Sequence, residues 1–175
     1  MSQIIFIVEG ETEQKLTNTL YLGKVIRANL WNLDPKKIYS ILRLISNKGT
    51  KVFIVCDTDC IDNSKKERFI KNFHSIKKHI GKDNIFLFQQ NSNLEGELLY
   101  CLNINIKGLY SLFNNASGNG QFKRNFIDEK NLLAKLENNN FDLSKLWSRP
   151  LCPDLSELQE FHASPQDFSS MISRN

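Results

Sequence analysis

Hydrophobic positions in this chain follow two kinds of pattern, and the first consists of short runs in which nearly every residue is apolar. Such runs, bounded by polar residues or glycine, are typical of strands buried on both faces of a sheet. They predict three strands, at residues 3–8, 51–56 and 84–90.

The second pattern consists of apolar residues spaced three or four positions apart, as on one face of an α-helix. It predicts helices at residues 12–26, 36–46, 64–80 and 94–102. Strands and helices therefore alternate, and right-handed crossovers between successive strands would give a mainly parallel sheet. We expect an α/β fold of the Rossmann-like kind, with helices on both faces of the sheet.

The final third of the chain is less regular. Its pattern predicts a turn-rich loop at 114–120, helices at 126–136 and 154–161, and a loosely packed tail at 163–175. Because no long linker interrupts the sequence, we expect one domain over residues 1–125 and a short helical C-terminal extension, 126–175, packed on the same domain.

Composition is that of a globular protein, with 41% hydrophobic and 24% charged residues among 175. No apolar run approaches the roughly 20 residues of a membrane span. The N-terminus has no basic residue before the first predicted strand, so we expect no secretion signal and a cytoplasmic location with reduced cysteines. Cysteine and histidine spacings lack the pattern of a zinc site, and the net charge of +4 permits a polyanionic partner without requiring one.

Acidic residues follow all three predicted strands. They are Glu9, Glu11 and Glu13 after the first, Asp57 and Asp59 after the second, and Glu95 and Glu97 after the third. Because ligands of open parallel sheets bind beyond the carboxyl ends of the strands, these side chains are expected at one rim. Clustered carboxylates repel one another and need a cation, and their hard oxygens suit Mg²⁺ or Mn²⁺ rather than zinc.

Each acidic group also has a purely structural interpretation. Acidic residues in a first helical turn complement the helix dipole, which is worth roughly 0.3–1 kcal/mol each. Thr12 and Asp57 are both residue types that cap helices. The occurrence of all three groups at successive strand ends is what favours a metal site.

Two phrases of the sequence carry a family resemblance. Residues 7–13 read Ile-Val-Glu-Gly-Glu-Thr-Glu, and residues 55–59 read Val-Cys-Asp-Thr-Asp. Together they resemble the Toprim domain of topoisomerases, primases and related nucleases, and the first is most similar to RloB-like proteins and OLD-family nucleases of bacterial defence. Residues 92–99 are similar to a third, RloB-like motif but lack its proline and phenylalanine, which leaves Glu95 and Glu97 as alternatives for the third acidic position.

The resemblance spans roughly residues 3–125 and implies a Toprim-like catalytic domain over 1–125. It implies that Glu9, Asp57 and Asp59 are the core ligands of Mg²⁺ or Mn²⁺, that Glu13 faces the same ion, and that the third acidic position holds a second ion. Glu9 has an alternative role as general acid or base. The ions would polarise the phosphodiester and activate water.

Basic residues are the second requirement of such a site, because a phosphodiester transition state is stabilised by cations. The resemblance includes a lysine in a place comparable to Lys123, which we expect to be catalytic. The basic helix predicted for 64–80 could follow a nucleic-acid backbone, although simple solvation explains such a face equally well.

The sequence thus predicts a divalent-metal-dependent nuclease acting on DNA or RNA. The resemblance adds a role as a phage-defence effector, and because the chain has no P-loop, its ATPase partner would be a separate protein. The alternative is a non-catalytic Toprim-fold module that binds a protein partner or a phosphorylated ligand. The choice between DNA and RNA, endo- and exonuclease action, the number of ions and the oligomeric state stay open.

Overall fold

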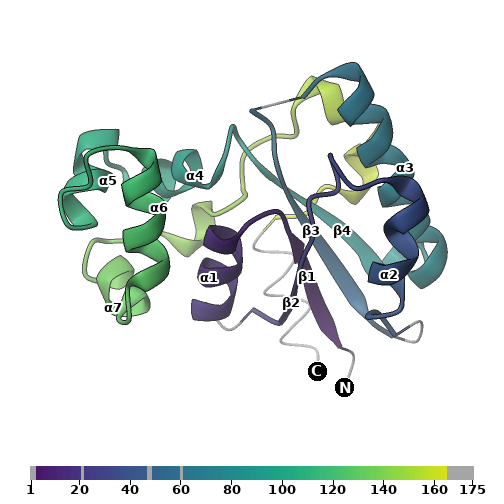
Figure 1. Ribbon diagram of the computed structural model, residues 1–175, viewed down its shortest axis with the longest axis horizontal. Coiled ribbons are helices and arrows are strands. Elements are labelled where there is room, and N and C mark those ends of the chain that lie inside the picture. Colours follow the sequence, from purple (N-terminus) through teal and green to yellow (C-terminus); the bar gives the residue numbers. More distant parts are fainter. Residues whose placement is uncertain (1–2, 21, 47–48, 60, 165–175) are drawn as a thin grey trace.

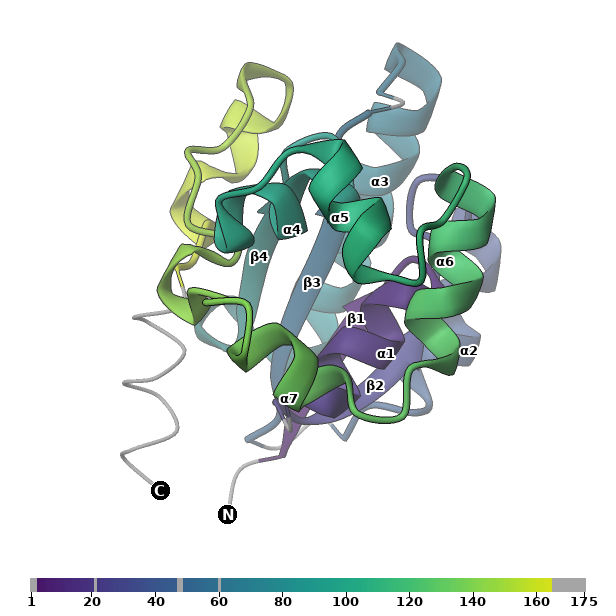
Figure 2. The same cartoon turned by 90° about the vertical axis from the view of Figure 1, so that its left-hand side faces the viewer.

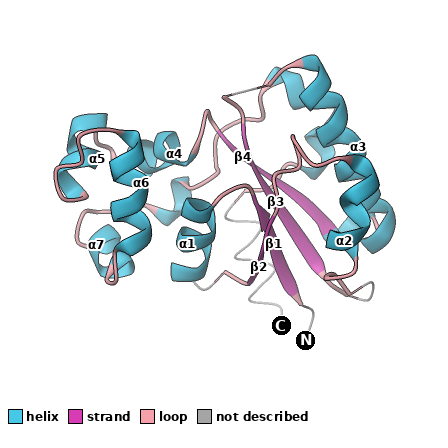
Figure 3. Ribbon diagram, in the orientation of Figure 1, coloured by secondary structure: helices cyan, strands magenta, loops and turns pink. Residues whose placement is uncertain are grey.

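A four-stranded sheet forms the centre of the molecule (Figure 3). The computed structural model describes residues 3–20, 22–46, 49–59 and 61–164. The strands lie in the order β2-β1-β3-β4, and their bounds are β1 (Ile4–Val8), β2 (Lys24–Arg27), β3 (Lys51–Asp57) and β4 (Ile85–Gln90). Every neighbouring pair is parallel, which confirms the expected α/β class with a parallel sheet.

The three predicted strands are neighbours in this sheet. Ile7 of β1 pairs in register with Ile54 of β3, which pairs with Leu87 of β4. Because all three run in the same direction, their carboxyl ends lie along one edge, where the loops that carry the acidic residues begin.

The prediction of one helix over 12–26 is wrong at its C-terminal end. Helix α1 (Glu11–Thr19) is shorter, and the chain turns back to form the edge strand β2. Gly23 makes this close return feasible, because a Cβ at this position would lie 2.9 Å from the carbonyl oxygen of Ile4. Only Ile26 of β2 is buried, so the strand lacks the continuous apolar run that marks the other three.

Helices cover both faces of the sheet (Figures 1 and 2). One face carries α1, α4 (Leu94–Leu102), α5 (Ile106–Leu112), α6 (Asn119–Asp128) and α7 (Leu132–Glu137). The other carries α2 (Ile38–Leu42), α3 (Asn63–Ile80) and the 3₁₀ helix η4 (Pro153–Phe161). Shorter 3₁₀ turns are η1 (Pro35–Lys37), η2 (Lys82–Asn84) and η3 (Leu143–Lys145).

Two apolar cores result from the alternation of side chains along each strand. Phe6, Phe53 and Phe88 stack beneath α1 and α4–α7, with ring centroids 5.0 Å apart for the first pair and 5.3 Å for Phe53 and Phe88. Ile54 and Leu87 face the other core, beneath α2, α3 and η4.

Helices predicted for the middle of the chain agree well with the structure, and those for the final third agree in part. The segment predicted as one helix over 126–136 contains the end of α6 and the start of α7, separated at Glu129, whose carboxylate accepts the N–H of Asn131. Helix α5 was not predicted, and the expected domain boundary at residue 125 falls inside α6. The predicted tail lies outside the described residues from 165 onward.

Within the described ranges, no helix has both the length and the hydrophobicity that a bilayer span requires. Three of the cysteines, Cys56, Cys101 and Cys152, are free thiols.

Candidate metal centre

Glu9 connects the carboxyl ends of three strands. It directly follows β1, and its Oε1 accepts the N–H of Asp57, the last residue of β3, at 3.0 Å. Its Oε2 accepts the side-chain amide of Asn29, two residues after β2, at 2.9 Å. Sequence reasoning missed Asn29 because it missed β2, and the β-branched pair Val25-Ile26 before it was the available signal.

Asp57 lies partly buried among other carboxylates. Its Oδ1 is buried and accepts no hydrogen bond from any residue of the described part of the chain. Burial, followed by the charges of Glu9, Glu13, Asp59 and Glu95, raises the pKa of Asp57 to about 9. An anionic Asp57 is therefore unfavourable in this position unless a cation accompanies it.

The same crowding acts on Glu9 and Glu13. Burial raises the pKa of Glu9 to about 7, although the backbone hydrogen bond that this side chain accepts opposes the shift. Burial also raises the pKa of Glu13, on which the charges of Lys123 and Glu95 act in opposite directions. Carboxylates from the β1–α1 segment, the end of β3 and the start of α4 thus share one poorly solvated region.

Two hollows meet at this group of acids. The residues that line both are Glu9, Asn29 and Asp57. The smaller hollow, of about 230 Å³, also contains Asp59 and Lys65. The larger, of about 440 Å³, extends along Glu13 of α1 to Lys123 and Arg124 of α6. A ligand could therefore reach the acids from either side of the strand ends.

Glu95 and Lys123 also belong to this region. Glu95 lies in the first turn of α4 with only 6% of its surface exposed, and Lys123 Nζ lies 3.4 Å from its Oε1. Lys123 is half-exposed and reaches the acids because α6 packs beside α1. The structure thus brings together six of the seven residues proposed from the sequence: Glu9, Glu13, Asp57, Asp59, Glu95 and Lys123.

Glu97, the seventh, has a different environment. It is fully buried, and its Oε1 accepts the N–H of Asn91 at 2.9 Å while its Oε2 accepts the N–H of Trp147 at 3.1 Å. It also forms an ion pair with Arg149. Both oxygens are therefore engaged within the protein, and of the two alternatives for the third acidic position only Glu95 joins the other acids.

Most of the basic residues of α3 lie far from the acids. Only the helix N-terminus is at the carboxyl edge of the sheet, where Lys65 lines the smaller hollow. Lys78 is thirteen positions further along the same helix, about 20 Å away at 1.5 Å per residue. Lys66 pairs with Glu157 instead, and Lys77 lies over the ring of Phe161. The predicted basic face is thus not one continuous surface at the site.

The donor set fits a hard divalent cation. In the described ranges, no three His, Cys, Asp or Glu side chains converge as in a formed metal site. The acids nevertheless raise one another's pKa values, and the buried Oδ1 of Asp57 has no donor from the described residues. Carboxylate oxygens of this kind are ligands of Mg²⁺ and Mn²⁺, and a bound cation would relieve their repulsion.

Comparison with known proteins gave no match to this chain among family models, curated proteins or solved structures. Fold and site together define an α/β protein with a crowded acidic group at the carboxyl edge of a parallel sheet.

Proposed function

We propose that this protein is a divalent-metal-dependent nuclease that hydrolyses phosphodiester bonds in DNA or RNA. The observation that carries the proposal is the buried Oδ1 of Asp57, which has no hydrogen-bond donor among the described residues and lies in the field of Glu9, Glu13, Asp59 and Glu95. Such crowding costs stability in a protein without a ligand, and perturbed carboxylates of this kind are most common where a site serves chemistry.

The Toprim resemblance supports the proposal because the fold meets its main requirement. The Glu-Gly phrase and the Asp-x-Asp phrase lie 48 positions apart, yet the parallel sheet places them at adjacent strand ends, where Glu9 bonds to the backbone of Asp57. The role in phage defence and the separate ATPase partner come from the resemblance alone.

Glu9, Asp57 and Asp59, with Glu13 facing the same ion, would hold one ion, and Glu95 would hold a second. An ion bound there supplies Lewis-acid polarisation of the scissile phosphate and lowers the pKa of a bound water. Lys123, beside Glu95, is placed to neutralise charge on a phosphate in the larger hollow.

Basic residues also line a hollow beside the larger one, although one of them, Arg27, is paired with Glu11. This third hollow, of about 250 Å³, shares Glu11 and Ile127 with the larger one, and is also lined by Lys15 and Arg27. The two run between α1 and α6, which lie side by side on the face turned to the viewer in Figure 2. With Arg124 at the larger hollow, this arrangement suits the phosphate backbone of a nucleic-acid strand leading to the acids.

The experiment that tests this function is incubation of the purified protein with linear and circular DNA, single-stranded DNA and RNA, with and without Mn²⁺. We expect Mn²⁺-dependent cleavage of at least one substrate class, and its loss in EDTA. Binding of nucleic acid or a phosphorylated ligand without any cleavage would instead support the non-catalytic module.

A strand that crosses the acids from the larger hollow enters the smaller one, where Lys65 lies. Lys65→Ala is therefore expected to weaken nucleic-acid binding about three- to tenfold at low salt, and to reduce the slope of log K against log salt by about 1, because one phosphate contact is lost. Fluorescence anisotropy with a labelled oligonucleotide measures this, in an Asp57→Asn background where no cleavage is expected. Lys78→Ala is the matched control, since the same change on the same helix lies about 20 Å from the site. Equal effects of both substitutions would contradict the proposed location of the substrate.

A further inference from the structure

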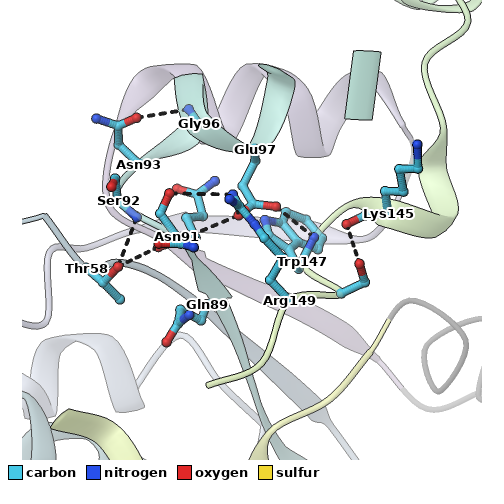
Figure 4. Close-up of polar contacts among 12 residues, drawn as sticks. Thr58, Gln89, Asn91, Ser92, Asn93, Gly96, Glu97, Lys145, Trp147 and Arg149 are labelled. Atoms are coloured by element: carbon cyan, nitrogen blue, oxygen red, sulfur yellow. Dashed lines mark hydrogen bonds and ion pairs between the residues drawn. The ribbon is translucent and has the colours of Figure 1, made fainter. Parts of the chain in front are cut away.

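Glu97 joins two segments that are far apart in the sequence (Figure 4). Its donors are the N–H of Asn91, in the loop between β4 and α4, the N–H of Trp147, and the guanidinium of Arg149, both after η3. The carboxylate has no exposed surface. Because a buried charge is stable only when its partners are in place, residues 147–149 and the β4–α4 loop are held in one fixed arrangement.

The β4–α4 loop packs directly on the first turn of α4. A Cβ on Gly96 would lie 2.7 Å from the carbonyl oxygen of Asn91, so the close approach requires glycine. Asn93 caps the helix by accepting the N–H of Gly96 at 3.1 Å. This packing explains the glycine between Glu95 and Glu97, and it prevents the loop from shifting independently of the helix.

The same loop determines where Asp59 lies. The carbonyl oxygen of Ser92 accepts the N–H groups of Thr58 at 2.8 Å and of Asp59 at 3.1 Å. Thr58 Oγ1 accepts the N–H of Ser92 at 3.0 Å and donates to the carbonyl oxygen of Gln90 at 3.0 Å. The side-chain amide of Asn93 donates to Asp59 Oδ2 at 3.4 Å. Hydrogen bonds therefore fix the backbone of the Asp-x-Asp segment to the β4–α4 loop, and Glu97 is bonded to the same loop.

Two residues of this network have a left-handed backbone conformation, which residues other than glycine rarely adopt. Ser92 has φ 69° and Trp147 has φ 57°, both in the left-handed region. In this conformation Trp147 directs its N–H to Glu97 and Ser92 meets the Asp-x-Asp segment. Strain of this kind persists only where surrounding contacts compensate for it, and it is concentrated at functional sites.

We propose that Glu97 is a positioning residue: by tying residues 147–149 to the β4–α4 loop, it holds Asp59 in place beside Asp57. The inference rests on the proposed function, in that Asp59 is taken as a ligand of the ion. The segment after η3 contributes no residue to the acidic group. Under this proposal its role is to position Asp59 through Glu97 and the β4–α4 loop.

The test compares Glu97→Gln and Arg149→Met with wild type in three measurements: Mn²⁺ affinity, thermal melting, and amide hydrogen exchange at Thr58 and Asp59. We expect Mn²⁺ affinity of the folded protein to fall about tenfold or more, as for other groups that orient metal ligands, and the Asp59 amide to exchange faster. Glu129→Gln is the matched control, because Glu129 also accepts a backbone N–H and pairs with a cation, Lys135, without contact to the site loops.

A lower melting temperature with unchanged Mn²⁺ affinity and unchanged exchange at Asp59 would overturn the inference while leaving the proposed function intact. If Glu97→Gln does not fold, Arg149→Met decides by the same criteria. If wild type itself binds no Mn²⁺, the proposed function fails, and hydrogen exchange alone then decides whether Glu97 positions Asp59.

Discussion

Asp57→Asn is expected to abolish Mn²⁺-dependent cleavage and to make the metal-free protein more stable. The substitution keeps the shape of the side chain but removes an anionic ligand, and an ion supplies several kcal/mol of transition-state stabilisation. A loss of about 3–5 kcal/mol corresponds to a rate lower by roughly two to four orders of magnitude. In the absence of metal at neutral pH, the folded protein keeps Asp57 protonated although the unfolded chain would release that proton. Asn needs no proton, so the substitution should stabilise the metal-free fold by about 1–3 kcal/mol.

Thermal melting and cleavage by the same preparations measure both effects. Asp154→Asn is the control, since it makes the same chemical change at an exposed position of η4. If Asp57→Asn unfolds the protein while each folded molecule retains its activity, Asp57 is a structural residue and the metal-site proposal is wrong.

Stability of the metal-free protein is expected to fall as pH rises between about 4 and 9. Burial raises the pKa of Glu9 to about 7 and that of Asp57 to about 9, so the folded protein retains protons that the unfolded chain has already released above pH 4. The stabilisation is complete below the unfolded pKa values and is lost as pH rises through the folded ones. The slope is about 1.4 kcal/mol per pH unit for each proton retained.

Denaturant unfolding at a series of pH values, with EDTA and with Mn²⁺, measures this dependence. Mn²⁺ should reverse it, because the ion binds the deprotonated acids and stabilises the folded state by mass action. Asp57→Asn should remove the part of the slope above pH 7. A slope in EDTA that Asp57→Asn leaves unchanged would show that other groups cause it.

Sequence pattern alone was sufficient for the three strands that carry the acids, because each is buried on both faces and therefore continuously apolar. It was insufficient for β2, an edge strand in which Lys24 and Arg27 are exposed and whose apolar pair continues the helical spacing of α1. Asn29 was missed with it, since only the pairing of β2 with β1 brings this residue to Glu9.

The choice between Glu95 and Glu97 could not be made from the sequence for a different reason. The two residues lie in the same helical turn, and what separates them is Arg149, which is 52 positions away. Lys123 also depends on distant packing. The family resemblance proposed this residue, but only the packing of α6 beside α1 brings it close to Glu95. Long-range packing of this kind has no local signal. Whether these residues are catalytic stays a prediction.

The most direct test of a metal-dependent acidic centre is a Mn²⁺ titration of the wild-type protein and Asp57→Asn, followed by electron paramagnetic resonance of free Mn²⁺. The account predicts saturable binding by wild type, its loss or a large weakening in Asp57→Asn, and wild-type binding by Asp154→Asn. Absence of saturable binding to the folded wild-type protein, or equal binding by wild type and Asp57→Asn, would contradict it.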